Sequence, residues 1–310
     1  MKQQNSPFKT SIGGQALIEG VMMRGPEASA MAVRLPDGEI DVEVTPNQTG
    51  QKWYKKAPFI RGGFNMIDSL IFGYNCLMKS ASKSGMEEEE PSKFETWLSK
   101  VFGTSINNIV AVFALILGGA LAIGLFMVLP AVITGLFRAF LPTPFTRSLV
   151  EGIIKIALFL TYLAVVSKMP DIYRVFQYHG AEHKTIACYE AGLELTVENA
   201  RVQTRFHPRC GTSFLLIVMV ISILLFSVVT WSSIAMRILL KLLLLPVVVG
   251  ISYEIIKFAG RHDNPFTRAI SAPGLWLQRL TTNEPDDSQL EVAIASVLPV
   301  LPKEEGSDRW

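Results

Sequence analysis

Two of the four histidines lie four residues apart, in the string His179-Gly180-Ala181-Glu182-His183. On a helix this spacing brings both imidazoles to one face, one turn apart, where they can bind the same ion. The string also fits the H-x-x-E-H pattern of inverted zinc proteases, in which the glutamate activates a water molecule. It therefore predicts His179 and His183 as metal ligands and Glu182 as a catalytic base.

Such a site needs further ligands, and the segment RFHPRCG at 205–211 offers two, His207 and Cys210, three residues apart around a proline. Glu190 shares the helical face of His183 but lies about 10 Å further along the helix, too far to reach the same ion. A divalent metal, zinc, fits a donor set of this chemistry. We expect it at His179, His183, His207 and Cys210, with the reservation that four protein ligands would make the site structural, because catalytic zinc keeps one position open.

Other interpretations of these residues remain open. The two helical histidines would also suit an interfacial helix, with their imidazoles bonded to carbonyl groups and lipid headgroups. His262 and Asp263 lie just beyond the last predicted membrane helix and are further candidate ligands. Three arginines spaced along the same loop are typical of a phosphate site or, more simply, of cations facing lipid headgroups: Arg201, Arg205 and Arg209.

The helix that carries His179 and His183 is predicted to begin at Pro170 and to end at Gly192, about twenty residues later. The chain as a whole is rich in apolar residues: 49% of its 310 residues are hydrophobic and only 18% are charged. A net charge of +2 gives no strong field for nucleic acid, and the sequence has no direct nucleic-acid recognition motif.

About four membrane-spanning helices are predicted. No charged residue lies between Lys100 and Arg138, which predicts one span with a kink or an end at Pro130. Residues 152–167, 211–231 and 238–256 predict the other three, with Trp231 at an interface. We expect an α-helical membrane protein.

Basic residues concentrate between the second and third predicted spans and after the fourth, which places both termini in the cytoplasm. An odd number of cysteines, three, suits that reducing compartment. The N-terminus lacks the apolar stretch of a signal peptide, so internal segments are expected to direct the chain to the membrane.

The cytoplasmic parts include a small β-rich element and amphipathic helices. Residues 16–23, 31–35 and 40–44 predict about three strands, with a turn at Pro36-Asp37-Gly38. Residues 59–78 and 273–280 predict interfacial amphipathic helices, Glu87–Glu90 before Pro91 a solvated linker, and residues 286–298 a last short helix. The expected divisions are residues 1–57, the cytoplasmic β-rich element; 58–100, the interfacial helix and acidic linker; 101–257, the four-helix membrane domain with the histidine-bearing cytoplasmic loop 168–210; and 258–310, the cytoplasmic C-terminal tail.

Four strings in the chain resemble the YqhQ-like bacterial membrane proteins: GGQALIEGVMMRGP, YHGAEHKTIACYE, RFHPRCGTSF and TTNEPDDSQLEVA. The resemblance covers residues 11 to 298. That family carries a domain of unknown function and is described as predicted metal-dependent enzymes. The resemblance implies a multi-pass protein of the bacterial cytoplasmic membrane with an unestablished activity.

Three classes of function fit these patterns. The first is a metal-dependent hydrolase at the cytoplasmic membrane face, acting on a peptide or a lipid-linked substrate. The second is a non-enzymatic membrane factor that takes part in membrane-protein assembly or insertion, or serves as the scaffold of a partner complex. Transport is the weakest, because Glu151 and Glu254 fall near the ends of the predicted spans rather than in mid-membrane.

Overall fold

The computed structural model describes residues 8–47, 57–85, 106–228, 234–262, 264–304 and 306–309. The chain forms two compact units, each assembled from segments that are distant in sequence. The first unit combines Met1–Met86, Leu163–Ile221 and Leu245–Trp310, and the second combines Glu87–Tyr162 and Ser222–Leu244. The N-terminal element, the histidine-bearing loop and the C-terminal tail thus share one folded unit.

The first unit contains a four-stranded antiparallel sheet in the order β1-β2-β3-β4. The strands are β1 (Gly13–Leu17), β2 (Gly20–Arg24), β3 (Ala28–Arg34) and β4 (Ile40–Pro46). The prediction of one strand over residues 16–23 is wrong, because the chain reverses at Ile18 and Glu19 and pairs Leu17 with Gly20. Glu19 takes a positive φ of 50°, which the sequence does not signal because no glycine occupies that position. The predicted turn before β4 is confirmed, with Gly38 at φ 92°.

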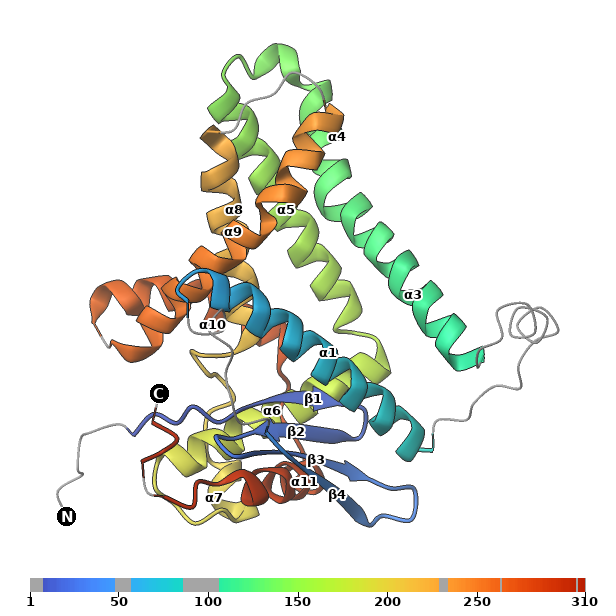
Figure 1. Cartoon of the computed structure of the whole chain (residues 1–310), viewed down its shortest axis with the longest axis vertical. Coiled ribbons are helices and arrows are strands. Elements are labelled where there is room, and N and C mark those ends of the chain that lie inside the picture. Colours follow the sequence, from blue (N-terminus) through green and yellow to red (C-terminus); the bar gives the residue numbers. More distant parts are fainter. Residues whose placement is uncertain are drawn as a thin grey trace. The chain divides into compact units, whose positions relative to one another are not determined.

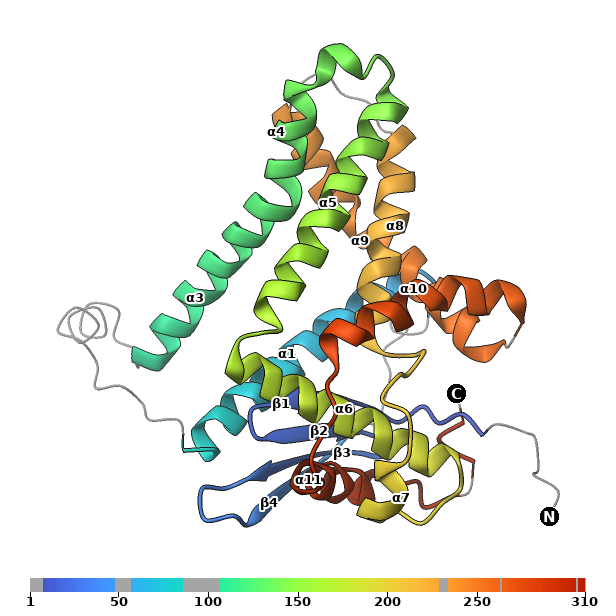
Figure 2. The same ribbon diagram turned by 180° about the vertical axis from the view of Figure 1, so that it is seen from behind.

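Alternate side chains of the inner strands enter two different cores. Val21, Met23 and Ala30 join the core formed with α6 (Pro170–Glu190) and α11 (Asp287–Val297). Met22 and Met31, on the opposite face, pack with Cys76 of α1 (Ile60–Lys83). Figure 1 shows α1 on one side of the sheet, and Figure 2 shows α6 and α11 in front of its other side. The sheet is therefore covered on both faces.

The helix predicted from Pro170 is confirmed. It has Pro170 in its first turn after Met169 and ends at Glu190, two residues before Gly192, which has φ 66°. The predicted helices over 59–78 and 286–298 are present as α1 and α11. The first unit also contains α7 (Val197–Arg201), α10 (Pro265–Thr281) and the short η4 (Leu298–Val300).

Apolar helices dominate the rest of the chain: α3 (Ile106–Ile123), the π-helical turn η2 (Gly124–Val128), α4 (Leu129–Leu136), η3 (Arg138–Phe140), α5 (Pro144–Val166), α8 (Gly211–Val228) and α9 (Ile234–Arg261). By length and composition, three stretches are long and apolar enough to cross a membrane: Val112–Leu136, Phe145–Val166 and Ile238–Arg261. The described apolar part of α8, Gly211–Ser227, is shorter. Three of the four predicted spans thus have a helix of sufficient length.

Pro130 does not end the first of these stretches, so the prediction of a helix end at this residue is wrong. The helix continues to Leu136, and the π-helical turn Gly124–Val128 immediately precedes the proline. A wider turn accommodates a residue that has no backbone N–H to donate. Four features named from the sequence lie outside the described residues: Glu87–Glu90, Pro91, Trp231 and Asp263.

Candidate metal centre

The structure brings together three of the four predicted ligands. One ligand atom from each of His179, His183 and Cys210 lies within 4.8 Å of the other two. His179 Nε2 is 3.2 Å from Cys210 Sγ, and the centroids of the two imidazole rings are 4.5 Å apart. Tetrahedral zinc with these donors separates its ligand atoms by about 3.3–3.6 Å, and the distance between His179 Nε2 and Cys210 Sγ is close to this range.

Backbone carbonyl groups orient both imidazoles. His179 Nδ1 lies 2.8 Å from the Thr281 carbonyl oxygen, and His183 Nδ1 lies 2.6 Å from that of Arg205. A carbonyl oxygen only accepts, so each Nδ1 carries a hydrogen, and in the neutral form of each ring Nε2 keeps its lone pair. Metal-binding histidines show this arrangement, in which the second nitrogen donates to a carbonyl group and fixes the tautomer. The donor set therefore fits a metal ion.

Glu182 lies beside the three candidate ligand residues and is almost fully buried. Its Oε1 accepts a hydrogen bond from the Gly14 backbone N–H at 3.0 Å, and its Oε2 lies 3.9 Å from His179 Nε2. Strand β1 thus holds one carboxylate oxygen while the other is directed toward the candidate site. Burial raises the pKa of this carboxyl group, although His183 and His179 act in the opposite direction.

The charges of the ligand residues depend strongly on one another. Burial lowers the pKa of the His179 imidazole, but Cys210 and Glu182 together raise this pKa to about 9. For the Cys210 thiol, burial alone would raise the pKa, yet His179 and His183 lower it well below its usual value. The site thus favours a thiolate, which is the form that binds metals.

His207 is close to the group of candidate ligands formed by His179, His183 and Cys210 but is not part of that group. Its ring centroid lies 5.4 Å from that of His183. Its Nε2 accepts a hydrogen bond from Arg209 Nη2 at 3.0 Å and lies 4.0 Å from a Glu190 carboxylate oxygen. Glu190 also pairs with Arg209. His207 and Glu190 thus both contact Arg209 beside the candidate site. A role of His207 as a metal ligand stays a prediction.

The chain between α10 and α11 supports the centre and was not identified from the sequence as part of it. The Asn283 backbone N–H donates to the Phe176 carbonyl oxygen at 2.8 Å. A Cβ at Gly180 would lie only 2.0 Å from the Asn283 carbonyl oxygen, so the HGAEH string needs glycine at this position. Gln278, near the end of α10, makes a second contact with the histidine loop. Its side-chain amide accepts a hydrogen bond from the His207 N–H and donates one to the His207 carbonyl oxygen.

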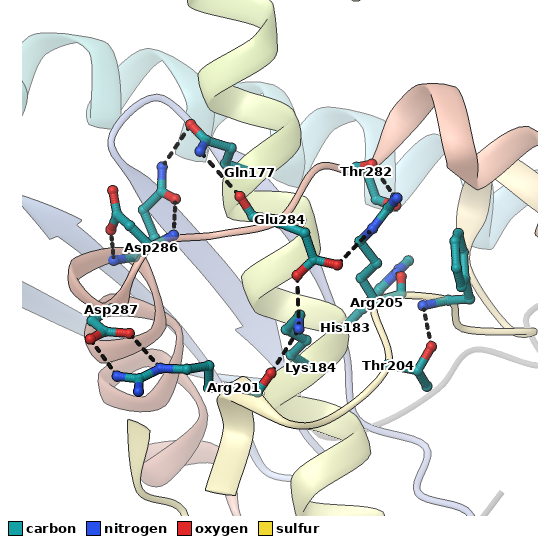
Figure 3. A network of polar contacts seen from close by, with 12 residues as sticks. Gln177, His183, Lys184, Arg201, Thr204, Arg205, Thr282, Glu284, Asp286 and Asp287 are labelled. Carbon is teal, nitrogen blue, oxygen red and sulfur yellow. Dashed lines mark hydrogen bonds and ion pairs between the residues drawn. The ribbon is translucent and has the colours of Figure 1, made fainter. Parts of the chain in front are cut away.

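Glu284 connects the segment between α10 and α11 to the histidine loop (Figure 3). Its carboxylate pairs with Lys184 at 2.9 Å and with Arg205 at 3.1 Å. Lys184 follows His183, and the Arg205 carbonyl oxygen is the acceptor for His183. The ionic contacts therefore hold His183 from two directions.

Each of the three loop arginines pairs with a carboxylate, and their contact with phosphate or with lipid headgroups stays a prediction. Arg201 pairs with Asp287, Arg205 with Glu284, and the buried Arg209 with Glu190. Among the described residues, the group of candidate ligands does not include His262. That imidazole is exposed, stacks on Phe258, and its Nδ1 lies 3.0 Å from the Phe258 carbonyl oxygen.

Comparisons with known proteins agree with the motif strings. Residues 57–303 match the family described as "Protein of unknown function (DUF1385)". The chain is 37% identical over 302 residues to the "Uncharacterized protein YqhQ" of Bacillus subtilis (strain 168), covering 96% of this chain and 95% of that protein. No solved structure matches significantly. The resemblance to YqhQ-like proteins is thereby confirmed, and the chain belongs to the DUF1385 family.

Proposed function

We propose that this chain is an integral membrane protein with a metal-dependent hydrolytic centre, of the zinc type, at the membrane face. The observation that carries the proposal is the orientation of the two imidazoles. Both use Nδ1 on backbone carbonyl groups and leave the other ring nitrogen for an ion beside the Cys210 sulfur. Three protein ligands would leave a fourth position for water or substrate, as in catalytic zinc sites.

In this centre Glu182 would act as the general base. Gly14 holds one of its oxygens, and the second lies on the side of His179, where it can take a proton from a water molecule. The bound ion would polarise the substrate and lower the pKa of that water. The substrate class we propose is a peptide or a lipid-linked molecule, because Cys210 directly precedes the apolar helix α8.

For the cellular location we propose the bacterial cytoplasmic membrane, with both termini in the cytoplasm and the lipid bilayer as the main partner. The chain has three helices that are long and apolar enough to cross a membrane, and these support the membrane placement. The basic residues of the histidine loop and of the region after α9 support the orientation. The similar Bacillus subtilis protein is also bacterial.

Metal analysis of the purified full chain in detergent tests the centre. We expect about one equivalent of zinc in the wild type, in Glu182→Gln and in the control His262→Ala. We expect its loss in His183→Ala and Cys210→Ser, with circular dichroism confirming that all variants are folded. A metal-free wild type, or full zinc in His183→Ala, would refute the proposal.

A second candidate is a non-enzymatic membrane factor in which the metal is structural. The observation that favours it is burial: His183 is 1% exposed and Cys210 is 8% exposed. Cobalt substitution separates the two functions, since azide alters the visible absorption of cobalt only where a coordination position is open. A spectral change on adding azide supports the hydrolase, and an unchanged spectrum supports the structural site.

A further inference from the structure

Helix α1 has two apolar faces: the sheet covers one of them, and in the part of the chain that the structure describes the side chains of the other are largely exposed. On the covered face, Cys76 packs with Leu17, Met22 and Met31 of the sheet, together with Phe72 and Leu77. Gly73 lies so close to the sheet that a Cβ there would be 2.0 Å from the Gln15 side-chain oxygen. The Ile18 backbone N–H donates to the Ser80 hydroxyl at 3.3 Å. This face fixes α1 on the sheet.

The opposite face is an exposed row that we call the α1 stripe: Phe64, Ile67, Leu70, Ile71, Tyr74 and Met78. Each of these side chains is more than two-fifths exposed, with Leu70 at 63% and Ile71 at 59%. At about 100° per residue, the six positions fall within an arc of roughly 120°. Apolar side chains scattered singly are normal on a protein surface, whereas a continuous patch marks a binding face.

The charged residues of α1 lie outside this arc, on one flank of the helix. Arg61 pairs with Glu254, Lys79 with Glu43, and Lys83 with Asp41. The stripe itself therefore contains no charge that an apolar environment would have to accommodate. A separated charged flank and apolar face are typical of helices that lie in a membrane interface.

The first turn of α1 is attached to a helix long and apolar enough to span a membrane. A Cβ at Gly62 would lie 2.6 Å from Tyr253 Cβ, and one at Gly250 would lie 2.3 Å from the Phe59 carbonyl oxygen. Glu254 accepts hydrogen bonds from Arg61 Nε at 2.8 Å and from the Phe59 N–H at 3.2 Å. These contacts fall in the second half of the stretch Ile238–Arg261. The α1 stripe therefore starts beside the C-terminal half of the stretch Ile238–Arg261.

We infer that the α1 stripe lies in the boundary between the headgroups and acyl chains of the bilayer, on the side where α9 ends. The inference rests on the membrane placement proposed above. It makes α1 a link whose outer face contacts lipid and whose inner face carries the sheet. Because β1 of that sheet holds Glu182 through Gly14, the link also fixes the candidate metal centre at a set height near the membrane surface.

Photo-crosslinking in native membranes tests this inference. A benzophenone amino acid replaces Leu70, and mass spectrometry identifies what it captures. Two matched positions serve as controls: Val202, an apolar residue of the first unit that is 79% exposed, and Leu115 of α3, which is 70% exposed. We expect phospholipid adducts at positions 70 and 115, and at least a tenfold lower lipid yield at position 202.

The outcomes distinguish this inference from the membrane placement on which it rests. Lipid adducts at position 115 but not at 70 would overturn the lipid contact of α1 and leave the spans in place. An adduct at position 70 with a second copy of the chain, or with another protein, would overturn it as well. No lipid adduct at either position would overturn the membrane placement itself.

Discussion

Two adjacent glycines, Gly13 and Gly14, begin strand β1 but meet very different surroundings. A Cβ at Gly13 would find no atom within 4 Å. One at Gly14 would lie 2.5 Å from the Met22 carbonyl oxygen and 3.0 Å from Glu182 Cγ. The close approach at Gly14 is what allows its N–H to reach the Glu182 carboxylate.

Alanine at these two positions should therefore have different effects. We expect Gly14→Ala to lower the free energy of unfolding by about 1–3 kcal/mol, because the strand must shift to relieve the overlap. Gly13→Ala should change it by less than about 0.5 kcal/mol. Thermal unfolding of the detergent-solubilised chain measures both. Equal effects would show that β1 is not packed against Glu182 as the structure describes.

At the candidate site, sequence spacing predicted only what is local. His179 and His183 meet because they are one turn apart on a helix whose two ends the sequence marks with a proline and a glycine. Cys210 was included from its chemistry, and the structure places it beside them. Gly14 and Glu284 were missed as supports because their contacts join residues far apart in the chain. For Glu284 the motif string TTNEPDDSQLEVA was the available signal, but no local rule links it to Lys184.

Strands β3 and β4 were predicted near their observed positions, whereas the division between β1 and β2 was missed. Alternation in β4 identified that strand, and its Val42 and Val44 remain largely exposed. In β2 the first four residues are all buried, since α1 covers one face of the sheet and α6 and α11 the other. A strand buried on both faces has no period of two, so its limits cannot be read from hydropathy alone.

Helices α5 and α9 contribute a buried ionic cluster to the second unit. Glu151 pairs with Lys241, Lys155 lies one turn from Glu151, and all three side chains are buried. Lys241 also lies 5.7 Å from the Phe226 ring centroid. In an apolar setting, losing one member of a pair leaves the other charge poorly compensated. The cluster should therefore determine how α5 and α9 associate.

A double-mutant cycle measures this association. We expect Glu151→Gln and Lys241→Gln each to lower the melting temperature in detergent by several degrees. The double variant should lose less than the sum, with a coupling of about 1–3 kcal/mol. As a control, Glu151→Gln combined with Lys79→Gln should be additive, since Lys79 pairs with Glu43 in the first unit. Additivity in both cycles would refute a stabilising role for the pair.

The whole first unit is closed by contacts between the two ends of the chain. Thr10 forms an isolated β-bridge with Arg309, and its hydroxyl donates to the buried Asp308 carboxylate at 2.5 Å. Tyr189 of α6 donates to the same carboxylate at 3.1 Å. The Thr10 backbone N–H donates to Glu190 at 2.7 Å. These bonds join both terminal segments to the end of the helix that carries the histidines, and no local pattern in the sequence predicts them.

Removing the Asp308 carboxylate should release the N-terminal segment without unfolding the unit. We expect Asp308→Ala to cost about 1–3 kcal/mol, because it leaves the buried Thr10 hydroxyl and the half-buried Tyr189 hydroxyl without their acceptor. Opening of this kind is local, so trypsin should cleave after Lys9 several-fold faster in the variant while the core helices stay intact. Lys303→Ala is the control, since the Lys303 side chain is 86% exposed and its removal should leave the cleavage rate unchanged. Mass spectrometry of timed digests follows the cut, and equal rates in wild type and Asp308→Ala would mean that the terminal contact does not hold the segment in place.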